Sequence, residues 1–279
     1  MAQAAAPGRI TGKTRIMFIL GDPVAHIVGT ALFNEHFREI GLDAAASPIH
    51  IAAADLALFL DALPKMRNVA GTGVTIPHKI AVVPHLDRLT PRARRIGAVN
   101  FVRCEANGTL VGDNLDGIGF VAGLARNGIA VAGKRVLQAG AGGVGRAIAF
   151  AVAEAGAAHQ VIANRTPDKA RALAEEVGMA FPACRCAPGP ARSKGFDIVV
   201  NATSLGMHAG DRLPIDTTGL APPCTVAEVV MTPEIIPLLA EGRSRKCTII
   251  GGKEMLLEQL QLAVEFLFVK RTIGAAEPS

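Results

Sequence analysis

The feature that most constrains the fold of this chain is a glycine-rich turn between an apolar strand and an alanine-rich helix. Residues 135–139 predict the strand, Gly140-Ala141-Gly142-Gly143-Val144-Gly145 the turn, and residues 146–150 the start of the helix. In a βα unit, this spacing gives a tight turn at the first glycine, room for a diphosphate at the second and close helix packing at the last. We therefore predict a dinucleotide site at Gly140, Gly142, Gly143 and Gly145. A turn that only packs a βα unit is the less favoured alternative.

The end of the next predicted strand indicates which dinucleotide would bind. Residues 160–163 lead into Asn164-Arg165-Thr166, roughly 20 residues past the glycines, where NAD-binding proteins usually carry an acid for the ribose 2′-hydroxyl. This chain offers a cation and hydrogen-bond donors there instead, with Lys169 close behind. These groups suit a 2′-phosphate, so the sequence favours NADP over NAD. A helix cap at Thr166 beside an exposed arginine is the structural alternative.

Strand and helix patterns alternate along the chain and predict parallel sheets with crossover helices. Predicted strands are residues 16–20, 47–51, 69–75, 99–104, 109–111, 135–139, 160–163 and 198–200, and predicted helices are residues 30–39, 56–63, 116–127 and 253–270. Asn107-Gly108 is a strong hairpin signal between two of these strands. We predict an α/β fold with a domain boundary near residues 112–120.

The composition of the chain indicates which kinds of binding partner to expect. Hydrophobic residues make up 50% of the 279, charged residues 19%, and the net charge is +5, which is typical of a compact globular protein with some attraction for a small anionic ligand. The basic groups are scattered and Tyr and Trp are absent, so we expect neither nucleic-acid nor membrane binding. Five cysteines without framework or metal spacing predict free thiols in the cytoplasm and no metal site. Residues 1–15 contain no apolar signal segment.

A second candidate site lies at the predicted strand-to-helix corner Val74-Thr75-Ile76-Pro77-His78-Lys79. Proline is favourable in the first turn of a helix, where its missing N–H costs nothing. Lys79 is unexpected there, because the positive end of the helix dipole disfavours a cation. Corners of this kind carry the sites of many α/β enzymes. A surface lysine whose stem covers apolar neighbours is the alternative interpretation.

Three further polar residues stand where chemistry or binding could use them. Asp116 opens a predicted helix, where it is also a candidate N-cap. Asn100 lies near a strand start. Gln259 lies between Leu256 and Ala263 on the apolar face of the last predicted helix, so its amide needs buried partners or a ligand.

Together these segments resemble the shikimate dehydrogenase family, in order and spacing, from about residue 16 to 270. The matching segments are residues 74–79, 97–100, 112–116, 140–145 with 164–166, 201–207 and 251–259. The resemblance implies an N-terminal α/β substrate domain, residues 1–115, completed by the C-terminal helix at about 252–270. It also implies an NADP-binding Rossmann domain, residues 116–251, with the site in the cleft between the two domains.

The resemblance implies roles for individual residues. Lys79 looks like the catalytic lysine and Asp116 like its carboxylate partner, both at the substrate oxygen that changes oxidation state. An ammonium group there stabilises developing charge and supplies a proton. Asn100, Gln259 and Thr75 look like ligands of substrate hydroxyls. Thr203 and Met207, in the segment 201–207, look like cofactor-binding residues.

The departures from the family pattern concern the substrate carboxylate. The family's Ser-x-Ser-Pro reads Ile27-Val28-Gly29-Thr30 here, so both serine hydroxyls are missing. Hydrogen bonds to charged groups contribute about 1.5–3 kcal/mol each, so losing two would cost roughly 10²- to 10⁴-fold in kcat/KM. Thr30 and free N–H groups at the helix start could recover part of this loss. The usual Asn before Val-Thr is Gly73, the usual Thr between Asn and Asp is Leu115, and the usual Tyr of a later loop is Val230.

We therefore predict an NADP-dependent dehydrogenase that interconverts shikimate-like cyclic hydroxy acids and their 3-keto forms, with an altered carboxylate pocket, as a monomer or homodimer. A quinate- or aminoshikimate-type enzyme is one alternative, and a non-catalytic ligand or nucleotide sensor on the same fold is another. Lys79 and Asp116 argue against the sensor, because binding alone does not require them.

Overall fold

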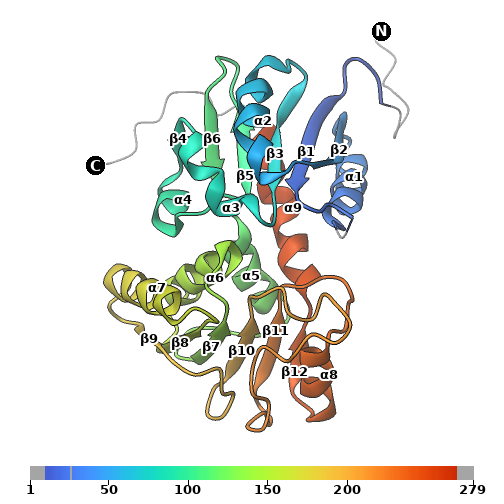
Figure 1. The fold of residues 1–279 in the computed structure, drawn as a ribbon. Helices are drawn as coiled ribbons and strands as arrows, with labels where there is room; N and C mark the ends of the chain where they lie inside the picture. Colours follow the sequence, from blue (N-terminus) through green and yellow to red (C-terminus); the bar gives the residue numbers. More distant parts are fainter. Residues whose placement is uncertain (1–9, 26, 269–279) are drawn as a thin grey trace.

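The structure is a computed structural model that describes residues 10–25 and 27–268. Two predictions lie partly outside this range. They concern residues 1–9 of the N-terminal segment and residues 269–270 of the predicted C-terminal helix. Two six-stranded sheets form separate halves of the molecule (Figure 1). The chain thus forms a two-domain α/β fold, as predicted, whereas the boundary at residues 115–116 stays a prediction.

The first sheet has the strand order β2-β1-β3-β5-β6-β4. Its strands are β1 (Arg15–Gly21), β2 (Ala44–His50), β3 (Val69–Val74), β4 (Arg88–Leu89), β5 (Phe101–Cys104) and β6 (Leu110–Asp113). The helices of this part are α1 (Gly29–Glu39), α2 (Leu56–Ala62), α3 (His78–Ala81) and α4 (Pro91–Ile96). Every residue of β3 is buried, as expected of a central strand.

The expectation of parallel pairing is wrong for part of this sheet. β5 pairs antiparallel with both β3 and β6. The pairing with β6 follows from the predicted hairpin at Asn107-Gly108, which reverses the chain without the crossover that a parallel pair needs, whereas the antiparallel pairing with β3 was not predicted. β2 begins at Ala44, three residues before the predicted start, and Ala44 pairs with Arg15 of β1. Alanine has a weak strand preference, so the sequence pattern did not include these residues.

The second sheet has the order β12-β11-β10-β7-β8-β9, and all its pairs are parallel. Its strands are β7 (Arg135–Ala139), β8 (His159–Ala163), β9 (Arg185–Pro188), β10 (Ile198–Asn201), β11 (Thr225–Glu228) and β12 (Thr248–Ile250). The helices that follow the first domain are α5 (Asp116–Arg126), α6 (Gly143–Glu154), α7 (Pro167–Ala180), α8 (Pro237–Ser244) and α9 (Gly252–Phe268). β7 lies at the centre, so the glycine turn after it falls where parallel sheets bind ligands.

The last helix joins the two halves. α9 runs from the second sheet toward the first and packs along α5 on the way (Figure 1). One apolar core combines Met17, Phe33 and Phe101 with Leu256 and Leu260 of α9. The apolar core beside the N-terminal sheet is therefore completed by α9.

All five cysteines are free thiols. Burial raises the pKa of Cys186 and of Cys224 to about 12. Among the helices of residues 10–25 and 27–268, none is both long and apolar enough to cross a membrane.

Candidate functional site

Lys79 and Asp116 form a buried ion pair between two elements that are far apart in sequence. Lys79 lies in α3, directly after β3, and its Nζ donates to Asp116 Oδ2 at 2.5 Å. Their side chains are only 15% and 4% exposed. Asp116 is the first helical residue of α5, and its side chain makes no cap, so the N-cap interpretation is wrong. Its carboxylate instead holds the lysine, which is therefore no surface side chain.

Asn100 links this pair to the last helix. Its Nδ2 donates to Asp116 Oδ1 and to Gln259 Oε1, both at 2.9 Å, and its Oδ1 accepts from the backbone N–H of Leu115 at 2.8 Å. Gln259 is 2% exposed and donates to the Met255 carbonyl. The buried partners expected for this amide are present. Four predicted site residues from α3, α5, α9 and the segment before β5 thus share one hydrogen-bonded network.

The glycine turn lies against Lys79. A Cβ built on Gly143 would come within 2.8 Å of Lys79 Cβ, closer than real Cβ atoms approach one another. A larger residue at position 143 would displace the lysine. The turn predicted to bind a dinucleotide and the predicted catalytic lysine are therefore neighbours.

The three motif glycines occupy the environments that a diphosphate turn requires. Gly140 has φ +113°, and a Cβ there would lie 2.5 Å from the Ala202 carbonyl oxygen. A Cβ on Gly145 would lie 2.4 Å from the Gly140 carbonyl oxygen. A Cβ on Gly142, by contrast, meets no atom of the described residues within 4 Å. Open space at this position, before the free N–H groups of α6, fits a bound diphosphate.

The residues after β8, predicted to bind the adenosine end of the cofactor, lie beside the glycine turn. Asn164 accepts from the Ala141 N–H through Oδ1 and donates to the Thr166 carbonyl through Nδ2. Arg165 and Thr166 are exposed. Thr166 is the N-cap residue of α7 but makes no side-chain capping bond, so its hydroxyl is not used as a cap. An exposed cation beside the glycine turn remains available for a 2′-phosphate.

The loop that carries Thr203 and Met207 is held by a buried carboxylate. Glu228, at the end of β11, is 1% exposed and accepts from Asn201 Nδ2 at 2.8 Å and from the N–H groups of Val229 and Val230. Asn201 Oδ1 in turn accepts from the Thr203 hydroxyl at 2.7 Å. Met207, half-buried, packs against the apolar cluster of the second domain. Burial raises the pKa of Glu228 to about 8, outweighing the N–H donors that lower it.

This raised pKa predicts a pH-dependent stability. Because the folded state binds the Glu228 proton more tightly than the unfolded chain, whose carboxyl titrates near 4.5, the free energy of unfolding falls as pH rises from about 4.5 to about 8. One such group contributes a slope of about 1.4 kcal/mol per pH unit inside that window. Urea unfolding at several pH values should show this slope in the wild type and lose it in Glu228→Gln. The exposed-site control Glu175→Gln should keep it, and equal slopes in all three proteins would contradict the prediction.

Comparison with known proteins decides the family. Residues 19–102 match the model for the shikimate dehydrogenase substrate binding domain, and residues 124–208 match the model for shikimate / quinate 5-dehydrogenase. The shikimate dehydrogenase (NADP(+)) of Geobacter metallireducens is 39% identical over 265 residues, which cover 91% of each chain. The chain belongs to the shikimate dehydrogenase family. It is an NADP-dependent dehydrogenase of that family.

Solved structures of the family share the fold. The shikimate 5-dehydrogenase of Thermus thermophilus, in complex with NADP(H) and shikimate, has a TM-score of 0.83 and 32% identity, with 91% of this chain and 94% of that chain covered. The ligand-free 5-ketofructose reductase of a Gluconobacter species has a TM-score of 0.81 and 33% identity, with 92% and 94% covered. Solved structures that resemble this chain are thus named for different substrates.

The family's serine positions have apolar surroundings in this family member. A Cβ on Gly29 would lie 3.6 Å from Ile19 Cδ1 and from Leu256 Cδ2, and Ile27 packs against the same core. Gly29 does not have a positive φ, so a serine at this position would not strain the backbone. The Thr30 hydroxyl is buried and has no hydrogen-bond partner among the described residues. Thr75, predicted to bind a substrate hydroxyl, is half-buried and directly follows β3.

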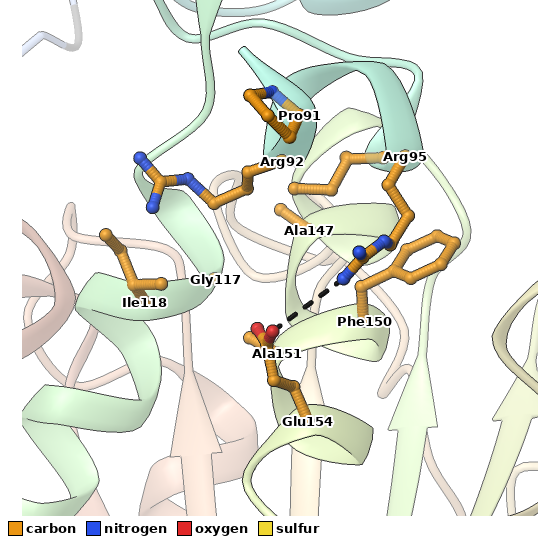
Figure 2. A pocket seen from close by; sticks show the side chains of 10 residues that line it. Pro91, Arg92, Arg95, Gly117, Ile118, Ala147, Phe150, Ala151 and Glu154 are labelled. Atoms are coloured by element: carbon orange, nitrogen blue, oxygen red, sulfur yellow. Dashed lines mark ion pairs between the residues drawn. The ribbon is translucent and has the colours of Figure 1, made fainter. Parts of the chain in front are cut away.

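A cavity of about 230 Å³ lies elsewhere at the domain junction, between α4, α5 and α6 (Figure 2). Arg95 turns toward Glu154 across it, with 3.7 Å between Nη1 and Oε1 (Figure 2). Arg92 lies on the other side and binds Asp113 of β6. Each arginine already has an acidic partner, and no predicted site residue lines this space within the described chain. The cavity is therefore separate from the Lys79 network.

Sequence reasoning missed two buried polar residues that hold the site loops. Gln138 lies in the apolar strand β7 and is fully buried, and Glu228 ends the apolar strand β11. A polar side chain inside a central strand of a parallel sheet needs a specific partner. Such a polar residue within an apolar strand is visible in the sequence.

Proposed function

We propose that this family member interconverts a secondary hydroxyl and a ketone in a small polyhydroxylated compound, with NADP as the redox partner and without a serine pair for a substrate carboxylate. The observation that carries the proposal is the buried network of Lys79, Asp116, Asn100 and Gln259 beside the glycine turn. It combines one proton donor with amide groups that suit hydroxyls. NADP, when bound, supplies or accepts the hydride.

Each residue of the network has a distinct role in the proposal. Lys79 gives a proton to the substrate oxygen during reduction and takes it back during oxidation. Asp116 fixes the position of the ammonium group and balances its charge. Asn100 and Gln259 orient the neighbouring hydroxyls of the substrate. Retention of a proton donor in direct contact with the glycine turn favours an enzyme over a ligand sensor.

The substrate in this proposal is a ring acid of the shikimate kind, including quinate-like or amino-substituted relatives, whose carboxylate is bound weakly. A neutral polyol ketone is the second candidate. Two observations favour it: the apolar surroundings of Gly29 and Ile27, and the similarity to a protein named 5-ketofructose reductase. The alternatives differ in whether the substrate carries an anionic group.

A substrate panel tests the proposal. Purified protein is assayed for NADPH formation with shikimate and quinate, and for NADPH consumption with 5-ketofructose. We expect turnover of at least one of these compounds and a high KM for shikimate. Efficient turnover of 5-ketofructose, without turnover of shikimate or quinate, would indicate that the substrate is a neutral polyol ketone. If the protein binds NADP but turns over no compound of a wide polyol panel, the result would favour a non-catalytic ligand or nucleotide sensor.

Restoring the serines tests the carboxylate argument. Ile27→Ser with Gly29→Ser should raise kcat/KM for shikimate about tenfold or more, if half of the estimated hydrogen-bond energy returns. The gain should appear as a lower KM, because a carboxylate remote from the reacting carbon is bound alike in the ground and transition states. The matched control, Ile27→Ala with Gly29→Ala, changes the same positions without adding donors. A folded serine variant that equals the alanine variant would show that other groups bind the carboxylate.

A further inference from the structure

Gln138 places a primary amide directly beneath the glycine turn. Its Nε2 donates to the Gly140 carbonyl and to the Gly145 carbonyl, both at 2.8 Å. One NH₂ group has two hydrogens, so both are used. The side chain is 0% exposed, and a buried amide of this kind is costly unless it is fully bonded.

The neighbouring strand fixes the orientation of this amide. Gln160 of β8, also fully buried, donates through Nε2 to Gln138 Oε1 at 3.3 Å. Because Gln138 Oε1 accepts this bond, its Nε2 must face the turn. The two carbonyls it holds belong to the first and last glycines of the motif, which enclose residues 141–144.

We propose that Gln138 is a positioning residue for NADP: it ties the two ends of the turn together so that the N–H groups at the start of α6 converge on the cofactor diphosphate. The inference rests on the proposed diphosphate site at Gly140–Gly145. Gln138 acts through the turn. Its loss therefore weakens binding of the diphosphate and leaves binding of the 2′-phosphate end unchanged.

The test compares NADP with adenosine 2′-phosphate, a fragment that lacks the diphosphate. Gln138→Met keeps the length of the side chain and removes both donors. We expect it to weaken NADP about 10- to 30-fold, the scale of two lost hydrogen bonds, and to change the fragment affinity by less than about twofold. Gln138→Leu serves as the second variant if the methionine variant does not fold. Equal weakening of NADP and the fragment, or no weakening of NADP, overturns the proposal.

Gln160→Leu is the matched control for stability. It removes the second buried amide and its bond to Gln138 Oε1 but leaves both donors that hold the turn, so it should lower Tm and weaken NADP much less than Gln138→Met does. If Gln160→Leu weakens NADP as much as Gln138→Met does, the effect is general loosening of the sheet, and the proposal is wrong.

Gly142→Val separates failure of this inference from failure of the diphosphate site itself. Gly142 has φ −81° and ψ −169°, an extended conformation that valine adopts, and a Cβ there meets no described atom within 4 Å. The variant should fold and lose NADP binding. Unchanged NADP binding in Gly142→Val would remove the proposed site and this inference with it. Loss in Gly142→Val without loss in the Gln138 variants would overturn the inference alone.

Discussion

Replacing Lys79 with alanine should lower kcat by about 100-fold or more, the usual scale of general acid–base catalysis. The variant loses the amine that contacts Asp116, the group to which we assign proton transfer. Kd for NADP should hardly change, because the glycine turn stays intact. Single-turnover assays with the best substrate of the panel, together with NADP titration, measure both quantities.

Two controls make the Lys79 result interpretable. Lys65→Ala removes an exposed lysine of the same domain and should leave kcat unchanged. Lys79→Ala also leaves the buried Asp116 carboxylate without its cation, which costs stability, so Tm is measured alongside. A folded Lys79→Ala protein with near wild-type kcat would show that Lys79 has no part in proton transfer.

Replacing Arg165 with alanine should weaken NADP about 10- to 100-fold and NAD by little, because only the 2′-phosphate gains a charge-assisted hydrogen bond worth about 1.5–3 kcal/mol. Arg165 is exposed after the end of β8 and is available to such a group. Titration of both cofactors against wild type and variant measures the difference. Arg185→Ala, at the opposite end of the neighbouring strand β9, is the control. Equal losses for NADP and NAD would assign the 2′-phosphate to other residues.

The sequence predicted the elements that have strong periodicity or a local turn signal. The glycine turn, the hairpin at Asn107-Gly108 and the long C-terminal helix are encoded within short segments, so local rules suffice for them. The hairpin signal predicted the antiparallel pairing of β5 with β6, but the antiparallel pairing of β5 with β3 was not predicted, because the general βα pattern was applied to these two strands. The start of β2 was missed because alanines form a strand only when a neighbouring strand supplies the pairing.

The candidate site was predictable as a set of residues and not as a geometry. Lys79 and Asp116 are 37 positions apart, and Asn100 and Gln259 are 159 apart, so only the fold brings them into one network. The contact between Lys79 and Gly143 depends on how the two domains meet, which no local pattern encodes. The neighbours of Gly29 likewise come from α9 and β1. The sequence therefore shows that a serine is absent at position 29, but not that apolar side chains surround this position.

The position of α9 in the N-terminal core has a consequence for synthesis on the ribosome. β6 ends at Asp113 and α9 begins at Gly252. The face of the first sheet against which Leu256 and Leu260 pack therefore leaves the ribosome long before α9 does. At about 5–20 residues per second, the delay is roughly 7–28 s. During that time the apolar side chains of β1, β5 and α1 are available to chaperones or to other nascent chains.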